Sequence, residues 1–467
     1  MFKLLVVAIS YLVANSNGLN ENEDSIIYDP TAPKPCSNNA TSAYVDILLV
    51  IDTSSNMGNA NLRKIGTTLS LILPKFTIGQ QSDITQGYRN TRVGVITYDS
   101  NVKIIANYTD INSVLDVSKI LNGLTASNDH ATNIGGALFT ALGIVNPCSE
   151  TDDPNCIQLP YSRPTAIILF AAKAAVDDLG DNLGGIQDTL VFLANNDATL
   201  ITVNFNNADP ILTGVLDIIT YNKFAGVSMY NFVSTRSSLT KDFEWAILQA
   251  NCYCEQANNL FTSVKVQFDS TTNRYSRYRE CLWVGPRTVD QNPPVSTVEI
   301  CDYLPIQSVP ANILSADENK FFEAMILDSH IDGGGYIPSY FGLHKNKQSQ
   351  WVYYGYNLTE FPMSNYTNWA PGYPKPNDKC AILDSIDSKH ENLVWKSIGC
   401  DPSAQNFNYI WSICQFEGCD STTLDCCYAC AVENQGGFEG KVKKMKRRSE
   451  RKIKNSKGRF NRLINKN

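Results

Sequence analysis

The sequence predicts a doubly wound α/β domain followed by a second domain of short strands and few long helices. The 467 residues are too many for one ordinary core and suit two domains plus tails. Between residues 44 and 251, continuous apolar segments alternate with amphipathic ones, as parallel strands alternate with the helices that cover them. From residue 252 the chain becomes rich in Trp, Tyr, Cys, Pro and Gly, which indicates a domain of another kind.

Four short apolar segments predict the strands of the first domain. The first, Val45–Ile51 (VDILLVI), is a continuous run, as expected of a parallel strand that is buried on both faces. The others are Arg92–Tyr98, Thr165–Phe170 and Thr199–Asn204.

Amphipathic segments between these strands predict helices. Residues 61–76 carry apolar side chains at helical spacing: Leu62, Ile65, Leu69, Ile72 and Leu73. Further helices are expected at 114–121, 135–145, 183–194 and 238–250. Because strand and helix alternate throughout, we expect a doubly wound sheet.

In the second domain the clearest helix is predicted at Asp317–Leu327, with acidic residues in its first turn. Residues 418–430 then hold four cysteines within a short stretch.

The amino-terminal residues and the cysteines predict secretion. Residues 1–18 have Lys3 in front of a short apolar run, Leu4–Ala14, which is typical of a signal peptide and too short to span a bilayer. Fourteen cysteines behind such a leader indicate disulfides. Four Asn-x-Ser/Thr sequons predict glycosylation at Asn39, Asn107, Asn357 and Asn365. No later segment is long and apolar enough for a membrane span.

The charge is distributed unevenly. Residues 441–467 hold thirteen Lys or Arg and one acid, Glu450, so subtracting this +12 from the net −7 leaves −19 for the rest. Two interpretations stay open for this tail: a disordered, solvated segment, or an arm that binds polyanions such as glycosaminoglycans. A nuclear signal has a similar composition, but the leader argues against it, and no nucleic-acid partner is expected.

The sequence does not predict an enzyme. Its four histidines, His130, His330, His344 and His390, form no His-Glu-x-x-His motif and no recognisable triad order, and no Gly-x-Ser-x-Gly occurs. We expect surface or loop roles for them.

The end of the first strand carries Asp52-Thr-Ser54-Ser-Asn56, and His130-Ala-Thr132-Asn-Ile-Gly-Gly lies further along. With RVGVITYDSNV between them, these segments resemble the von Willebrand factor A family over about residues 43–251. The resemblance implies a metal-ion-dependent adhesion site, an oxygen cage for Mg²⁺ at the carboxyl ends of the strands. Its candidate ligands are Asp52, Ser54, Asn56 and Thr132.

Two departures weaken that site. Asn56 stands where the family has a serine, and Ala172 stands where it has a further carboxylate, with Lys173 beside it. Because the charge of the ligands tunes cation affinity, we expect Mg²⁺ binding to be weak or absent.

Residues 252–416 resemble a C-type-lectin-like domain. The segments that carry the resemblance are CLWV, DENKFF, YFGL, NWAPGYP, VWKSIGC and YIWSIC. The expected architecture is therefore an α/β doubly wound vWA-like domain followed by an α+β C-type-lectin-like domain.

This resemblance implies disulfides between Cys301 and Cys414 and between Cys380 and Cys400. An additional bridge to Cys281, from Cys252 or from Cys254, would mark the long form of the domain. In the first domain, Cys148 and Cys156 bracket a short loop and are expected to pair locally.

Sugar-binding members of the lectin family hold Ca²⁺ through a Glu-Pro-Asn or Gln-Pro-Asp motif and a Trp-Asn-Asp motif. Here the first aligns with 373–375 or 375–377 and lacks the Glu, and the second reads Trp395-Lys396-Ser397. Since Ca²⁺ takes six to eight oxygens, we do not expect calcium here. The residues expected to bind a ligand at this surface are Tyr373, Lys375, Asn377, Asp378 and Trp395.

The resemblances imply a secreted recognition or adhesion protein of the kind that nematodes make, binding an extracellular glycan or protein and serving innate defence. A calcium-dependent lectin and a disulfide-linked matrix protein remain alternatives. The expected organisation is a signal peptide (1–18), a linker (19–42), the vWA-like domain (43–251), the C-type-lectin-like domain (252–416), a Cys-rich segment (417–440) and a basic disordered tail (441–467).

Overall fold

The structure is a computed structural model in which the chain forms two compact units. It describes residues 34–80, 90–145, 163–175, 186, 189–190, 193–194, 198–254, 262–288, 301, 308–329, 338–356, 358–387, 392–400, 409–420 and 422. The larger unit comprises the described parts of 34–285, 316–335 and 417–422, and the smaller one those of 286–315 and 336–416. Across these residues, no helix is long and apolar enough to cross a membrane.

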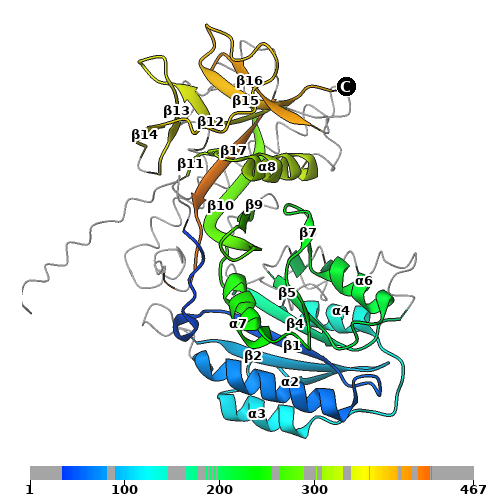
Figure 1. Cartoon of the computed structure of the whole chain (residues 1–467). Coiled ribbons are helices and arrows are strands. Elements are labelled where there is room, and N and C mark those ends of the chain that lie inside the picture. Colours follow the sequence, from blue (N-terminus) through cyan, green and yellow to red (C-terminus); the bar gives the residue numbers. More distant parts are fainter. Residues whose placement is uncertain are drawn as a thin grey trace, which may run out of the picture. The chain divides into compact units, whose positions relative to one another are not determined.

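A six-stranded sheet forms the centre of the larger unit (Figure 1). Its order is β3-β2-β1-β4-β5-β8, with bounds of Val102–Ala106, Arg92–Tyr98, Asp46–Asp52, Thr165–Ala171, Ala198–Asn204 and Asn231–Val233. All neighbouring strands are parallel except β3, an antiparallel edge strand. Strands β1, β2, β4 and β5 lie where the apolar segments predict them.

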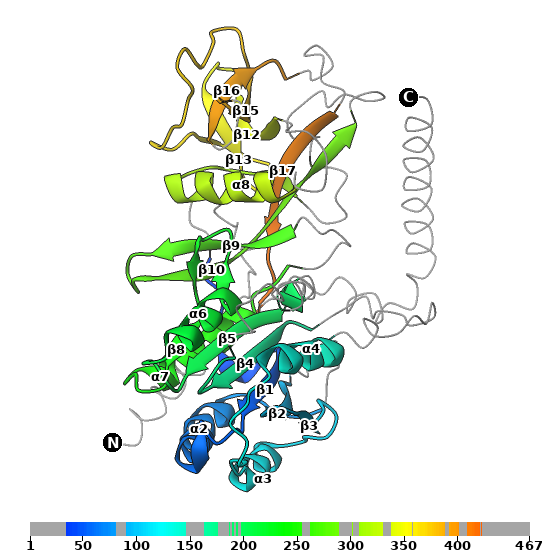
Figure 2. The same ribbon diagram turned by 90° about the vertical axis from the view of Figure 1, so that its right-hand side faces the viewer.

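Helices cover both faces of this sheet (Figure 2). Alternate residues of β1 point to opposite faces, so Ile47, Leu49 and Ile51 join one apolar cluster and Leu48 and Val50 the other. The first cluster includes side chains of α2 (Gly58–Ile72), α3 (Val114–Gly123) and α7 (Leu239–Ala250). The second includes those of α4 (Ile134–Val145) and α6 (Pro210–Ile219). The predicted doubly wound α/β fold is confirmed.

The helices show how local signals set element ends. Helix α2 stops at Ile72 and continues as the 3₁₀ turn η2 (Leu73–Lys75), because Pro74 cannot donate to an α-helical turn. Helix α6 was not expected, although Asp209 caps it by accepting two backbone N–H bonds and Pro210 occupies its first position. Most of the predicted helix at 183–194 lies outside the described residues.

The remaining short elements of the larger unit are η1 (Ala40–Ser42) and the hairpin of β6 (Tyr221–Asn222) and β7 (Val227–Ser228). A longer hairpin follows, formed by β9 (Thr262–Asp269) and β10 (Arg274–Thr288), and α8 (Ala316–Ser329) contains the helix predicted at 317–327.

A buried ion triad joins β9, β10 and α8. The Lys265 ammonium lies 2.5 Å from a carboxylate oxygen of Glu318 and 3.1 Å from one of Glu280, and all three side chains are at most 6% exposed. Burial by itself lowers the pKa of Lys265, but the two carboxylates reverse this and raise it above its ordinary value. The lysine is therefore charged at any physiological pH.

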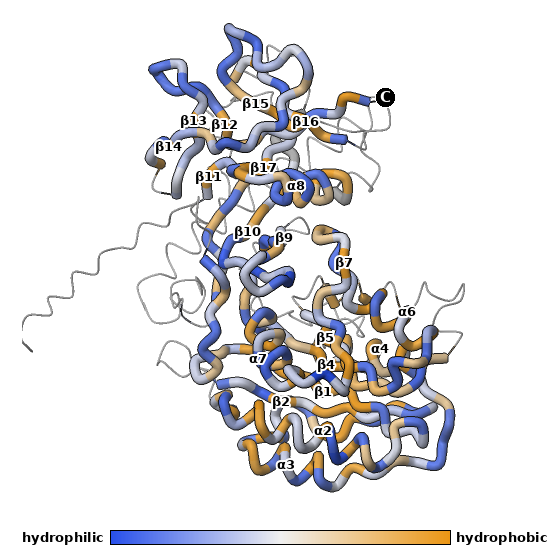
Figure 3. The backbone as a smooth tube through the Cα atoms, in the orientation of Figure 1, coloured by the Kyte–Doolittle hydropathy of each residue, from blue (hydrophilic) through white to orange (hydrophobic). Residues whose placement is uncertain are grey.

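The smaller unit is built from short strands, several of which are labelled along the tube in Figure 3. They are β11 (Val309–Pro310), β12 (Ser339–Lys345), β13 (Trp351–Tyr354), β14 (Glu360–Pro362), β15 (Cys380–Ser385), β16 (Leu393–Ile398) and β17 (Tyr409–Glu417). Strand β12 pairs antiparallel with β13 and β15 and parallel with β17, while β15 pairs with β16. The long segment between β14 and β15, residues 363–379, carries the positions that align with the first calcium motif of sugar-binding lectins.

Four disulfides staple the described residues: Cys36–Cys252, Cys254–Cys281, Cys301–Cys414 and Cys380–Cys400. The last two are the pairs that the lectin resemblance implies. Of the two cysteines considered as partners of Cys281, it is Cys254 that pairs with it. The pairing of Cys252 with Cys36 was not expected, and it anchors the segment before β1. Cys148 and Cys156 lie outside the described residues.

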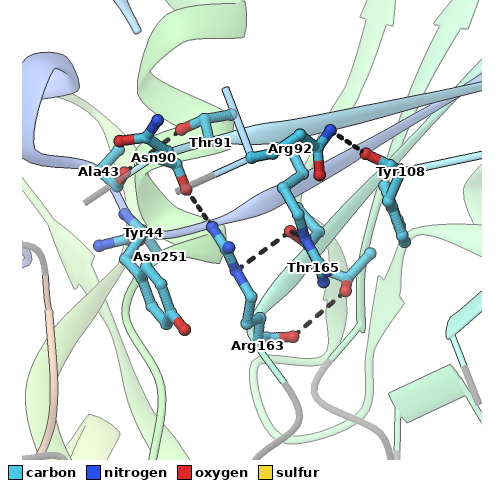
Figure 4. A network of polar contacts seen from close by, with 11 residues as sticks. Ala43, Tyr44, Asn90, Thr91, Arg92, Tyr108, Arg163, Thr165 and Asn251 are labelled. Carbon is cyan, nitrogen blue, oxygen red and sulfur yellow. Dashed lines mark hydrogen bonds and ion pairs between the residues drawn. The ribbon is translucent and has the colours of Figure 1, made fainter. Parts of the chain in front are cut away.

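At the amino ends of β1, β2 and β4 lies a polar network that includes Arg92 and Arg163 (Figure 4), and both of these side chains contact Asp46. Its carboxylate accepts a hydrogen bond of 2.9 Å from Nε of Arg92 and lies 3.1 Å from Nε of Arg163. The guanidinium of Arg163 also stacks on the ring of Tyr44, at 3.9 Å from the ring centre. This network lies at the opposite strand ends from the predicted metal site.

Candidate functional site

The first candidate site lies beyond the carboxyl ends of β1 and β4, where ligands bind in open α/β sheets. Asp52 ends β1 and is completely buried. Its two carboxylate oxygens accept hydrogen bonds from the backbone N–H groups of Ser54, at 2.8 Å, and Ala172, at 3.1 Å. Burial raises the pKa of Asp52, and these hydrogen bonds oppose the shift.

The side chain of Asn56 points its N–H donors, not its oxygen, toward this site. Its side-chain amide donates to the hydroxyl oxygen of Ser54 at 3.2 Å and to the carbonyl of His130 at 2.9 Å. The ammonium of Lys173 reaches the same carbonyl, at 3.5 Å. A cation at this position would therefore meet N–H groups where the family motif supplies a hydroxyl oxygen.

One observation does favour a cation. Within the described part of the chain, the hydroxyl oxygen of Thr132 is buried and has no hydrogen-bond partner. Together with Asp52 and Ser54 it offers oxygens from three side chains, of which only Asp52 carries a carboxyl group.

Sequence reasoning missed two acids close to this site. Asp99 follows β2 and lies near enough to raise the pKa of Asp52 further, although by less than burial does. The carboxylate of Asp129 accepts hydrogen bonds from the Ser100 hydroxyl and the Ala131 N–H. Asp99 directly follows a predicted strand and Asp129 lies in a predicted loop, but nothing in their spacing marks them as neighbours of Asp52.

The residues present do not fit a tightly held divalent cation. A hard ion needs about six oxygens, with enough negative charge to offset its dehydration. Here Asp52 is the single carboxyl group among the candidate ligands, Ala172 brings a backbone N–H where the resemblance implies a carboxylate, and Asn56 presents its N–H group. The metal site of the family is therefore not reproduced by these side chains.

The second candidate site is the segment 363–379 of the smaller unit. Residues predicted from two separate motifs meet here at Ser397, on β16. Its hydroxyl accepts a hydrogen bond of 2.7 Å from the backbone N–H of Lys375 and donates one of 2.7 Å to the Asp378 carboxylate. Asn377 is exposed beside them.

Trp395 belongs to the core. Its side chain is fully buried, and its ring packs edge-on against those of Trp369, at 5.6 Å, and Tyr366, at 5.5 Å. This burial excludes the Trp395 ring from contact with a ligand at the surface, although Trp395 was among the residues expected to bind one. Tyr373 is partly exposed, and the Lys375 ammonium lies over its ring, 5.0 Å from the centre.

These residues do not fit calcium. The carboxylate of Asp378 is engaged by the Ser397 hydroxyl, and Lys396, next to it, forms an ion pair of 2.9 Å with Asp384. Lysines stand where carboxylate and amide ligands would be needed, and a cation is repelled by them.

Three of the four predicted glycosylation sites are described. Asn39, Asn107 and Asn365 are all exposed, and Asn357 lies outside the described residues. The side-chain oxygen of Asn39 accepts hydrogen bonds from the backbone and the hydroxyl of Thr41, so this sequon forms a local turn.

Comparison with known proteins shows which families and proteins the chain is similar to. Residues 46–237 match the family model of the von Willebrand factor type A domain. The C-type lectin domain-containing protein 160 of Caenorhabditis elegans is 23% identical over 397 residues, which are 83% of this chain and 55% of that protein. The chain therefore spans little more than half the length of this relative.

Solved structures show weaker likeness. Proximal thread matrix protein 1 from the mussel byssus, solved with a zinc-occupied MIDAS motif, is 16% identical with a TM-score of 0.32, covering 45% of this chain and 47% of its own. Human lithostathine is 20% identical with a TM-score of 0.22, covering 30% of this chain and 92% of its own. From the family match, the relative and the observed fold, the chain contains a von Willebrand factor type A domain at 46–237 followed by a C-type lectin domain.

Proposed function

We propose that the chain is a secreted, non-catalytic recognition protein whose C-type lectin domain binds an extracellular glycan or protein without calcium. The observation that carries this proposal is the contact of Lys375, Ser397 and Asp378. These hydrogen bonds occupy the positions to which the lectin resemblance assigns calcium ligands, and they engage the one carboxylate there, that of Asp378.

The surface itself supports ligand binding. Tyr373 is partly exposed and Lys375 and Asn377 are exposed on one segment, which offers an aromatic face, a charge and an amide. Aromatic rings anchor interfaces because they bury a large area at a small entropic cost. The three exposed sequons and four disulfides agree with an extracellular site of action.

We propose that the type A domain likewise acts without a tightly bound divalent ion, and that the protein serves innate defence. A predicted signal peptide at 1–18 and domain limits at 43–251 and 252–416 complete this proposal.

A glycan array probed with the full-length secreted chain, with and without EDTA, tests the proposal. We expect a defined set of ligands that is unchanged by EDTA and weakened by Lys375→Ala. The matched control is Lys64→Ala, an exposed lysine on α2 of the other unit. Binding that EDTA abolishes would establish a calcium-dependent lectin instead. Covalent oligomers on non-reducing gels, together with no ligand, would favour a disulfide-linked matrix protein.

A further inference from the structure

Four lysines lie on the segment 363–379 or next to it. We call this surface the lysine face: Lys345, Lys347, Lys375 and Lys379. Lys347, Lys375 and Lys379 are exposed and Lys345 is partly exposed. Residues 345–379 contain only two acids, Glu360 and Asp378. Of these, Asp378 bonds Ser397, and Glu360 lies 3.5 Å from a ring nitrogen of His344.

Hydrogen bonds place Lys345 beside the segment that holds Lys375 and Lys379, and Lys347 follows Lys345 by two residues. The Lys345 ammonium donates to the carbonyl of Pro376 at 2.8 Å, and its backbone N–H donates to the carbonyl of Lys379 at 2.7 Å. The end of β12 is therefore joined directly to residues 376–379. Since the backbone N–H of Lys375 is bonded to Ser397, the position of Lys375 is fixed as well.

Aromatic rings border the lysine face. The Lys345 ammonium lies 5.2 Å from the ring centre of Trp351, and the ring of Trp351 packs 5.1 Å from that of Trp369. Both tryptophans are partly exposed. With Tyr373 under Lys375, the face combines ammonium groups with flat apolar surfaces. An anionic sugar presents the matching groups, because its ring has apolar C–H faces and its sulfates or carboxylates accept charged hydrogen bonds.

The charge of the rest of the chain makes this face unusual. Without the tail, the chain carries a formal charge of −19, so a cluster of positive charge is not a general property of its surface. Local attraction of an anion would therefore be specific to the lysine face.

We propose that the lysine face binds an anionic saccharide, sulfated or carboxylated, with ammonium groups taking the role that calcium has in other lectins. This inference rests on the proposed function, which it deepens by naming the class of ligand. Direct ammonium–anion contacts need no metal and weaken with salt.

Tryptophan fluorescence of the full-length chain tests this proposal, because Trp351 and Trp369 border the face and the basic tail contains no tryptophan. The probes are a sulfated heparin disaccharide, its unsulfated counterpart and hexaglutamate, each titrated with and without EDTA. We expect a saturable change with the sulfated disaccharide that EDTA leaves unaltered and that 500 mM NaCl weakens.

Substitution locates the binding. Changing Lys347, Lys375 and Lys379 together to Gln removes exposed charges, so the fold should persist and the Kd for the sulfated disaccharide should rise by about tenfold or more. The control changes three exposed lysines of the other unit to Gln and should leave Kd unchanged: Lys64, Lys103 and Lys241.

The other possible results would contradict different parts of the proposal. If the unsulfated disaccharide bound as tightly as the sulfated one, the ligand would not need to be anionic, and calcium-independent recognition would remain supported. Tighter binding of hexaglutamate would show that the face recognises acidic proteins. A requirement for calcium would refute the proposed function itself. An equal loss in both triple variants, or no change with any probe, would exclude the lysine face as the site.

Discussion

Removing the charge of Asp46 should destabilise the type A domain severely. The Asp46 side chain is 4% exposed and that of Arg163 is 7% exposed, and the two form an ion pair of 3.1 Å at the start of neighbouring strands. Burial lowers the pKa of Arg163, and the charge of Asp46 is the largest influence that opposes it. Asp46→Asn keeps the shape and leaves this guanidinium buried without a counter-charge.

The expected cost follows from that burial. Breaking a buried ion pair by removing one partner typically costs about 3–5 kcal/mol, whereas an exposed pair contributes about 0.2–1 kcal/mol. Arg92, the other partner of Asp46, is 27% exposed and regains water more easily, so most of the cost arises from Arg163. A loss of about 3 kcal/mol or more is a large part of a total stability of roughly 5–15 kcal/mol.

Urea unfolding followed by circular dichroism measures this change. The matched control is Glu244→Gln, which removes a carboxylate from an ion pair with Lys75, whose side chain is 47% exposed. A loss of no more than about 1 kcal/mol for Asp46→Asn, as expected of the exposed pair, would show that the burial of Arg163 does not make this ion pair important for stability.

Three further changes test other parts of the structure. Lys265→Met leaves two buried carboxylates without their shared cation and should lower the free energy of unfolding in urea by about 3 kcal/mol or more. Glu318→Gln leaves Lys265 paired with Glu280, so it should cost less, and equal costs would contradict this expectation. Hydrogen bonds from two threonine hydroxyls lower the pKa of Asp269 to about 2. Its ionised form therefore contributes to the stability of the folded state above the ordinary pKa of the group, and this contribution is lost as the pH falls toward 2. The difference in urea midpoint between wild type and Asp269→Asn should therefore shrink over that range; a constant difference would count against it. Replacing both Cys36 and Cys252 by serine should lower the free energy of unfolding by about 5 kcal/mol, by the loop-entropy relation for a separation of 216 residues. Chemical unfolding under non-reducing conditions measures this loss. An unchanged midpoint would show that the bridge does not constrain the unfolded chain.

The fold was predictable where burial leaves a continuous apolar pattern. Strands β1, β2, β4 and β5 are buried on both faces, so their sequences identify them. Strand β3 escaped prediction because it lies at the sheet edge, with Ile104 and Ile105 exposed and no alternation to mark it. The helix signal at Asp209-Pro210 was present but short, so α6 was missed.

The sequence predicts which residues belong to the candidate sites, but it does not predict which of their atoms are in contact. The family resemblances imply that Ala172 and Ser397 stand where metal ligands are expected, because the motifs of the families fix those positions. The sequence does not show that the Asn56 amide turns its N–H toward Ser54, or that the Lys345 ammonium reaches Pro376. Such contacts depend on how distant segments pack, which no local pattern specifies.

The bridge between Cys36 and Cys252 has a mechanical consequence. It connects the segment before β1 to the segment after α7, so every strand of the type A sheet lies within one covalently closed loop. Tension applied to the chain outside this loop passes through the sulfur–sulfur bond and bypasses the strands. The sheet would then keep its shape under pulling forces that would extend an unbridged domain, and only reduction of the bridge would expose it to that load.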